Sequence, residues 1–410
     1  MREKLKIQGD ILIWAVAILL LLIGMVAVYS TSSILEHRNE LSEGSTLTKQ
    51  IIISIVGIVI IYVSHRINYT VFSKFAPILF LISFVLLGYT MFFGTSINQG
   101  ARWVKIPGIG LTIQASDFAK LSLYIYLAKT LSLKRKEIKS LKKGFLPLIV
   151  PIALICFFIA FENLSTAILV GVTSCVILFI GRINVFHIFG LIISMFFLLL
   201  LVFFLSKATG IGRATTWEAR ITNFMNKDEN KYEKDENFQI TQAAIAIVRG
   251  GIIGKGPGNS WAKEYLPESY SDFVYAIIIE EYGLIGGIIV ILLYLMFLWR
   301  SILIFRKTPY AFGAFLALGL STTLVMQAFF NMAVAVQLFP VTGLTLPLIS
   351  KGGSSVVFTS IAIGIILSVS RNADELEIKY KNRLEEEKAE ENKINEEKET
   401  IEKYLETGGI

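Results

Sequence analysis

The sequence has few of the residues that build the catalytic sites of soluble enzymes. Charged residues make up only 17% of its 410 residues, whereas soluble domains contain about 25%. The histidines, His37, His65 and His187, are scattered over different loops, which argues against a histidine triad or a histidine metal site. Cys156 and Cys175 both lie in apolar runs and offer neither a disulfide framework nor metal-ligand spacing. Acid–base chemistry must therefore fall to carboxylates.

Hydrophobic residues, in contrast, make up 54% of the chain. A helix needs roughly 20 apolar residues to span a membrane, and runs of about that length recur. The sequence thus predicts an all-α polytopic membrane protein with one membrane domain at residues 1–371 and a charged tail at residues 372–410. We count ten spans, beginning near Ile11, Leu47, Pro77, Leu111, Leu146, Leu164, Ile188, Phe273, Ala311 and Leu344.

The basic residues indicate the orientation. The net charge is +7, and a dense basic cluster occupies residues 134–143. Positive charge is retained on the cytoplasmic side of membrane proteins, so we expect this loop, both termini and the tail to be cytoplasmic. The same distribution accounts for the net charge without a nucleic-acid partner. The long loop between spans seven and eight, at about residues 207–271, then faces outward.

This outer loop has an ordered part that leads to Asp272. Residues 227–237 are highly charged and are expected to be mobile, whereas residues 240–248 predict an apolar helix on the membrane surface. Five glycines between residues 250 and 258 predict backbone-controlled turns before Leu266 and Pro267. Asp272 stands where the chain re-enters a span, which is a natural position for a catalytic carboxylate. The alternative is an N-cap, a role that Ser271 could fill equally well.

Charged residues near the outer ends of other spans have two interpretations each. Lys120 lies inside a span, where a charge is costly unless it is paired or wet. It either pairs with Asp117 at helical spacing or holds an anionic substrate, and the sequence leaves both open. Arg102, beside Trp103, has the default interpretation of an interfacial anchor.

Two further groups of polar residues also have simple structural interpretations. Glu162 and Asn163 can cap the span that follows them, and the carboxylates of Glu280 and Glu281 can pair with basic residues between helices. Prolines and glycines between residues 340 and 353 break the last two spans, where a cavity could open outward.

Together these elements resemble the family named for shape, elongation, division and sporulation. The motifs that carry the resemblance are Gly-Pro-Gly-Asn-Ser at 256–260, Leu-Pro-Glu-Ser-Tyr-Ser-Asp-Phe at 266–273, Glu-Glu-Tyr-Gly at 280–283, and residues 340–347 continuing through 350–355. The segment 343–347 is more similar to the division branch than to the elongation branch. The chain departs from the family pattern at Asp117, Asn163 and Lys351.

The resemblance implies a peptidoglycan glycosyltransferase that polymerises lipid II into β-1,4 glycan strands at the outer face of the cytoplasmic membrane during division. Asp272 matches the family's essential aspartate and would act as general base. Lys120 and Arg102 match basic family positions and would stabilise the leaving diphosphate, with no certain cofactor but room for a divalent cation, Mg or Mn. The other expected substrate-binding residues are Glu162, Glu268, Ser271 and Ser354. The expected partners are a class B penicillin-binding transpeptidase and other division proteins.

Two other functions remain open on the sequence. A lipid II flippase would also use broken helices and intramembrane charges, but the acidic candidates concentrate on the outer side. A non-catalytic scaffold of the division machinery would leave Asp272 as a cap and Lys120 as half of a helix pair.

Overall fold

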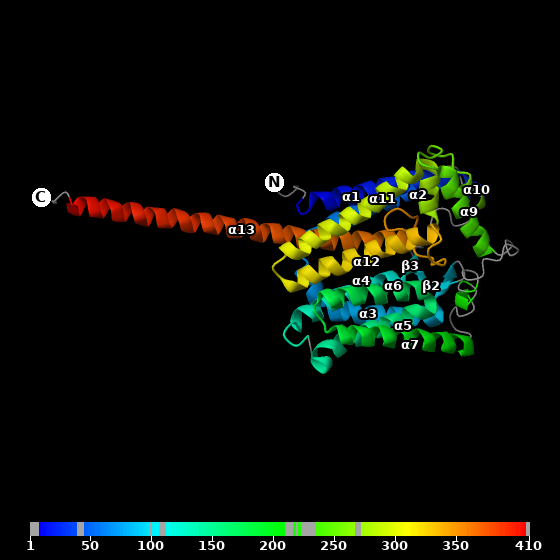
Figure 1. Ribbon diagram of the computed structural model, residues 1–410, viewed down its shortest axis with the longest axis horizontal. Helices are drawn as coiled ribbons and strands as arrows, with labels where there is room; N and C mark the ends of the chain where they lie inside the picture. Colours follow the sequence, from blue (N-terminus) through cyan, green and yellow to red (C-terminus); the bar gives the residue numbers. More distant parts are fainter. Residues whose placement is uncertain are drawn as a thin grey trace.

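The computed structural model describes residues 8–38, 45–97, 100–105, 112–138, 140–209, 216–218, 220, 222, 235–266 and 272–406. Long helices of this part of the chain lie side by side in one bundle (Figure 1). They are α1 (Ile11–Arg38), α2 (Ser45–Arg66), α3 (Thr70–Phe93), α4 (Ala115–Leu133), α5 (Leu146–Glu162), α6 (Leu164–Ile180), α7 (Val185–Thr209), α11 (Val274–Lys307), α12 (Ala311–Ala335) and α13 (Gly353–Glu406). The predicted helical membrane fold is confirmed.

Eight of these helices are long and apolar enough to cross a membrane. The remaining two are α6, an apolar helix of 17 residues, and α4, a helix of 19 residues that contains Asp117 and Lys120. Most residues of α4 are buried, including Asp117 and Lys120, so these two side chains face protein instead of lipid, which is where intramembrane charges are tolerated. Eight spans together with α4 and α6 agree with the predicted ten.

A small antiparallel sheet precedes α4 and was not predicted. Its strands are β1 (Thr95–Ile97), β2 (Gly100–Lys105) and β3 (Thr112–Gln114), in the order β1-β2-β3. Trp103 pairs with Gln114 and Lys105 pairs with Thr112. Because residues 112–114 pair with β2, α4 begins at Ala115, and the prediction that this span begins near Leu111 is wrong by a few residues.

The last span also begins later than predicted. We expected it to start near Leu344, but α12 ends at Ala335 and α13 begins only at Gly353. Pro340 and Pro347 each lack a backbone N–H, and Gly343 has a φ of +64°, a left-handed conformation that favours glycine. The predicted break between the two spans is therefore confirmed, and it is longer than a simple turn.

This segment between α12 and α13, residues 336–352, enters the bundle. Leu344, Leu346 and Ile349 are almost fully buried, and the carbonyl of Pro347 accepts a 2.5 Å hydrogen bond from Tyr294, near the middle of α11. Irregular backbone at membrane depth persists only where protein groups satisfy its hydrogen bonds. The segment therefore depends on polar side chains from neighbouring helices.

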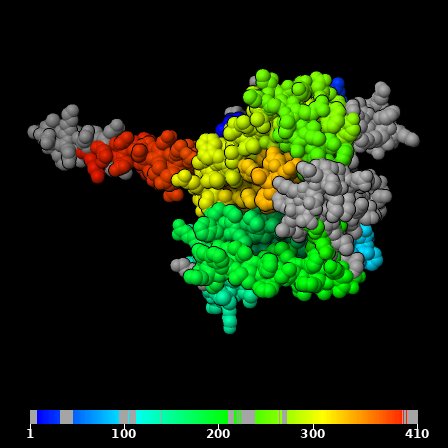
Figure 2. Space-filling view, turned by 45° about the vertical axis from the view of Figure 1, so that its right-hand side comes forward, coloured from blue at the N-terminus to red at the C-terminus, as the bar shows by residue number. Residues whose placement is uncertain are grey.

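The outer-loop elements and the ends of the chain lie at opposite ends of the bundle (Figure 1). The helices α9 (Asp235–Gly250) and α10 (Ala262–Tyr265) gather near the sheet, and α9 confirms the helix predicted at residues 240–248. At the other end lie the start of α1, the π-helix η2 (Leu141–Phe145) and the tail. The tail continues α13 without a break and stands clear of the body (Figure 2), so the domain boundary at residue 371 stays a prediction.

Candidate active site

Asp272 lies immediately before α11, where the chain returns to the bundle. The helix begins at Val274, with Phe273 in the N-cap position. Asp272 is half-buried, and its carbonyl oxygen accepts a 2.9 Å hydrogen bond from Nδ2 of Asn331 on α12. The helix start falls one residue later than the capping interpretation of Asp272 requires. Two predicted neighbours, Glu268 and Ser271, lie outside the described residues.

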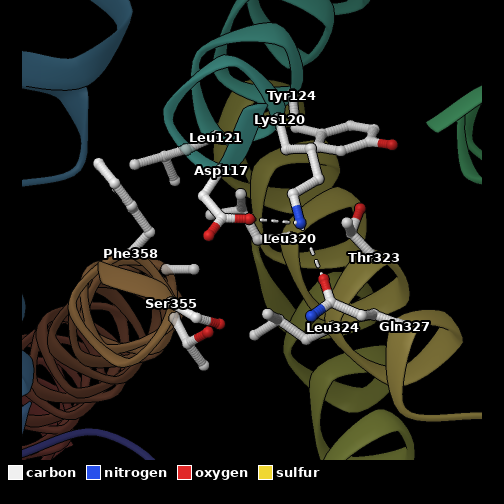
Figure 3. Close-up of a pocket in the computed structure, with 12 residues that line it drawn as sticks. Asp117, Lys120, Leu121, Tyr124, Leu320, Thr323, Leu324, Gln327, Ser355 and Phe358 are labelled. Carbon is white, nitrogen blue, oxygen red and sulfur yellow. Dashed lines mark hydrogen bonds and ion pairs between the residues drawn. The ribbon is translucent and has the colours of Figure 1, made fainter. Parts of the chain in front are cut away.

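Lys120 projects from α4 into a pocket between α4, α12 and α13 (Figure 3). Its Nζ lies 2.8 Å from Oδ1 of Asp117 and donates a 2.8 Å hydrogen bond to Oε1 of Gln327. The side chains of Tyr124 and Thr323 also line this pocket, which we call the lysine pocket. The predicted pair of Lys120 with Asp117 is therefore present, and so is a cavity beside it.

The lysine pocket contains polar groups whose hydrogen-bonding potential is not filled by the described residues. Lys120 is 8% exposed, and an ammonium group has three N–H donors. Two of them meet Asp117 and Gln327, and no other partner is found among the described residues. Oδ2 of Asp117 is buried and likewise has no hydrogen-bond partner in the described part of the chain. A buried cation with a donor to spare is suited to meet an anionic group.

Two amide side chains of α12, Gln327 and Asn331, were not predicted as site residues from the sequence. They are 4% and 1% exposed and lie one helical turn apart. Gln327 contacts Lys120, whereas Asn331 contacts the backbone of Asp272. Polar side chains inside a membrane span are functional candidates by default. The sequence feature that could have identified them is their spacing of four residues within the apolar run of α12.

The other predicted substrate-binding residues are more scattered. Glu162 ends α5 and accepts a short hydrogen bond from Thr90 of α3, and the following Asn163 caps α6 by accepting from the backbone of Ser165 and Thr166 at 3.1 and 3.4 Å. The predicted cap at this point is thus confirmed for the asparagine. No described contact joins Glu162 to the lysine pocket.

Neither Ser354 nor Arg102 is among the described residues that line the lysine pocket. Ser354 is 8% exposed in the first turn of α13, next to Ser355, which lines the lysine pocket. Its Oγ has no hydrogen-bond partner among the residues that the structure describes. Arg102 belongs to strand β2, and its side chain lies outside the described part.

Glu280 fastens the outer loop to α11. The residue is fully buried, and its carboxylate accepts hydrogen bonds from Oγ of Ser260 at 2.5 Å and from the backbone N–H groups of Trp261 and Ala262 at 3.1 Å each. Arg249 lies 3.9 Å away, so the predicted pairing of Glu280 with a basic residue is confirmed. The carboxylate holds α10, the last described helix before Asp272.

The backbone of the same loop packs directly on α11. A Cβ on Gly254 would lie 2.2 Å from the carbonyl oxygen of Glu281, and one on Gly283 would lie 2.0 Å from that of Ile252. Gly254 and Gly283 have φ values of +92° and +71°. The predicted role of the glycine-rich segment as a set of backbone-controlled turns is confirmed.

The described residues do not form a resident cation site. No group of three or more His, Cys, Asp or Glu side chains within that part of the chain is arranged to hold a metal ion. In the lysine pocket the ammonium of Lys120 already lies beside the Asp117 carboxylate. This donor set does not fit a bound Mg or Mn ion.

Comparison with known families identifies the fold and the lineage. The family model of FtsW, RodA and SpoVE, described as "Cell cycle protein", matches residues 10–375. The chain belongs to this family. The resemblance drawn from the sequence motifs is therefore confirmed.

The matches to individual members of the family cover most of this chain and of each relative. The chain is 33% identical over 377 residues to "Stage V sporulation protein E" of Bacillus subtilis. The aligned region covers 89% of this chain and 98% of that protein. It is 34% identical over 369 residues to "Probable peptidoglycan glycosyltransferase FtsW" of Geobacter metallireducens, which covers 88% and 94%. An FtsW of Haemophilus influenzae with the same description is also 34% identical, with coverage of 86% and 88%. The two relatives named FtsW agree with the division-like motifs, whereas the first is a sporulation protein.

Solved structures show the same fold. A chain from "Structural coordination of polymerization and crosslinking by a peptidoglycan synthase complex" matches with a TM-score of 0.69 and 23% identity, covering 89% of this chain and 98% of that one. The rod shape determining protein RodA of Thermus thermophilus matches with a TM-score of 0.61 and 21% identity, covering 89% and 97%. Members of the FtsW, RodA and SpoVE family thus share this helical membrane architecture.

Proposed function

We propose that this chain is a peptidoglycan glycosyltransferase that polymerises lipid II into β-1,4 glycan strands. The observation that carries the proposal is the buried ammonium of Lys120, which has an N–H donor for an anion, unused by the described residues. Its partner Gln327 lies one turn of α12 before Asn331, and Asn331 binds the backbone of Asp272. The named relatives support the reaction, because two of them are described as probable peptidoglycan glycosyltransferases.

Asp272 is the proposed general base. Its carboxylate takes the proton from the 4-hydroxyl of the acceptor GlcNAc as that oxygen attacks the anomeric carbon of the donor. The bond from this carbon to the diphosphate breaks in the same step, and the electron pair leaves with the lipid diphosphate. A single displacement inverts the anomeric configuration and needs no covalent enzyme intermediate.

Lys120 is the proposed electrostatic partner of the leaving group. Negative charge develops on the diphosphate as the bond breaks, and a cation held in place beforehand stabilises that charge without reorganising. Arg102 is proposed to assist from the adjoining outer segment. Glu162, Glu268, Ser271 and Ser354 stay proposed contacts to the substrate.

The reaction is proposed to take place on the outer face of the cytoplasmic membrane, at the division septum. The termini and the tail would then be cytoplasmic, in agreement with the basic residues at 134–143. A class B penicillin-binding transpeptidase is the proposed partner, supported by the structural match to a chain of a peptidoglycan synthase complex. Such a partner would cross-link the emerging strand.

A polymerisation assay tests the proposed function. The purified protein is incubated with labelled lipid II, alone and with a transpeptidase-inactivated partner, and the products are separated on a gel. We expect a ladder of glycan strands. Lipid II that stays monomeric under both conditions, while it is flipped across reconstituted vesicles containing the protein, would assign transport instead.

A further inference from the structure

Asn331 makes a double hydrogen bond that ties Asp272 to the segment between α12 and α13. Its Nδ2 donates to the carbonyl oxygen of Asp272 at 2.9 Å and to that of Leu344 at 2.7 Å. A side-chain amide has two N–H donors, so both are in use. Asn331 is 1% exposed, which leaves water little access to compete for either bond.

The carbonyl of Asp272 lies just outside the hydrogen-bond ladder of α11. The first intrahelical bonds of α11 go to Phe273, whose carbonyl oxygen accepts from the backbone of Ala276 and Ile277. The carbonyl of Asp272 precedes this ladder, as expected for a residue outside the N-cap. Asn331 therefore supplies a bond that the helix cannot, and it fixes the backbone from which the proposed base extends.

Gln327 makes the equivalent connection at the lysine pocket. Its Nε2 donates to the carbonyl oxygen of Thr345 at 2.9 Å, and its Oε1 accepts from Lys120 at 2.8 Å. The amide thus joins the proposed diphosphate-binding cation to the residue that follows Leu344. Both amides thus donate to backbone carbonyls of the same broken segment. Each also contacts one part of the site: Gln327 accepts from Lys120, whereas Asn331 donates to the carbonyl of Asp272.

Gln327 and Asn331 are four residues apart, so they lie on the same face of α12 with a rise of about 6 Å between them. We propose that they are positioning residues, which we call the amide bracket, and that the bracket sets the spacing between Asp272 and Lys120. This inference rests on the proposed function. Transfer of the glycan requires the base on the acceptor side and the cation at the diphosphate to be held at a fixed separation, because misplacement by about 1 Å can cost about 100-fold in rate.

The amide bracket is tested with Asn331→Ala and with Asn331→Ser, which keeps one donor. Turnover and KM for lipid II are measured in the polymerisation assay, and lipid II binding is compared between Asp272→Asn and the double variant Asp272→Asn/Asn331→Ala. We expect kcat to fall about 10- to 100-fold for the alanine variant and less for the serine variant. Binding of lipid II should be the same in the two proteins that carry Asp272→Asn.

Tyr294→Phe is the matched control. It removes one buried hydrogen bond to the same broken segment, at Pro347, but Tyr294 has no described contact with Asp272 or Lys120. We expect its Tm to fall, since a buried carbonyl left without a donor destabilises the fold. Its kcat should stay within about twofold of wild type, because the lost bond does not hold Asp272 or Lys120. Gln327→Ala removes the contacts to both Lys120 and Thr345, and we expect its kcat also to fall about 10- to 100-fold.

Three results would overturn the amide bracket. The first is a kcat for Asn331→Ala equal to that of Tyr294→Phe. The second is a loss of lipid II binding that accounts for the whole loss of activity, which would indicate a structural role. If Asn331→Ala does not fold, the serine variant decides, and wild-type turnover from a folded Asn331→Ser protein would be the third. The proposed function fails separately, through an inactive wild type or an active Asp272→Asn.

Discussion

Replacing both members of the Lys120–Asp117 pair separates its structural role from a role in catalysis. The perturbation is a set of three variants: Lys120→Met, Asp117→Asn, and the double variant. The two groups lie 2.8 Å apart, and each residue is 8% exposed. Lys120→Met therefore leaves a carboxylate buried without its cation.

The expected stabilities follow from burial. Removing one partner of a buried ion pair destabilises a protein by about 3–5 kcal/mol, whereas replacing both by uncharged groups of similar volume is often neutral or stabilising. We expect Lys120→Met to unfold well below wild type in a thermal scan, and the double variant to recover most of that loss. Gln327 loses the hydrogen bond from Lys120 in both Lys120→Met and the double variant, so this smaller cost cancels when these two variants are compared.

The expected activities differ from the stabilities. If Lys120 stabilises charge on the leaving diphosphate, the double variant still lacks that cation, and removal of one such preorganised group costs about 100- to 1000-fold in kcat. The assay is polymerisation of lipid II by detergent-purified protein, with the fraction of folded protein measured in the same sample. A double variant that regains both stability and wild-type turnover would refute the catalytic role and leave Lys120 as a structural partner of Asp117.

Other expectations concern the support of the site. Gly283→Ala should lower the Tm and the activity, because its Cβ would lie 2.0 Å from the carbonyl oxygen of Ile252, whereas Gly88→Ala, with no atom within 4 Å of its Cβ, should leave both unchanged; equal Tm values for the two variants would contradict the close packing. Glu280→Ala should make the outer loop more sensitive to limited proteolysis, since three donors lose their acceptor, and an unchanged cleavage pattern would contradict this anchoring. Truncation after Tyr380 should keep polymerisation within about twofold of wild type. The described part of the removed segment, residues 381–406, is a charged helix whose described side chains are exposed, and its ion pairs contribute at most about 1 kcal/mol each. Loss of activity with an intact fold would assign the tail a role in catalysis.

Much of the architecture was predictable because membrane spans depend on local composition. Runs of apolar residues located most of the helices, and the glycines between residues 250 and 258 predicted turns with unusual backbone angles, four of which have positive φ. The boundaries were less predictable. The start of α4 depends on pairing of residues 112–114 with β2, and the late start of α13 depends on a segment that is apolar yet not helical. Both effects arise from tertiary contacts.

The candidate site was predictable only in part, for a similar reason. Asp272 and Lys120 were found because each is a charge in an unusual place, at a helix start and inside a span. Gln327 and Asn331 carry no charge, and nothing in the sequence shows that they face Asp272 and Lys120 across a broken segment. Spacing along α12 places them on one face, but the packing of α4, α11 and residues 344–345 around that face decides what they bind.

The most direct test of the account compares wild type with Asp272→Asn in the lipid II polymerisation assay, under conditions where both proteins are folded and bind lipid II equally. Asparagine keeps the size of the side chain and the backbone contact with Asn331, but it cannot take up the acceptor's proton. We expect glycan strands from wild type and at least about a 100-fold slower reaction from the variant. Strands formed by Asp272→Asn at the wild-type rate would contradict this expectation.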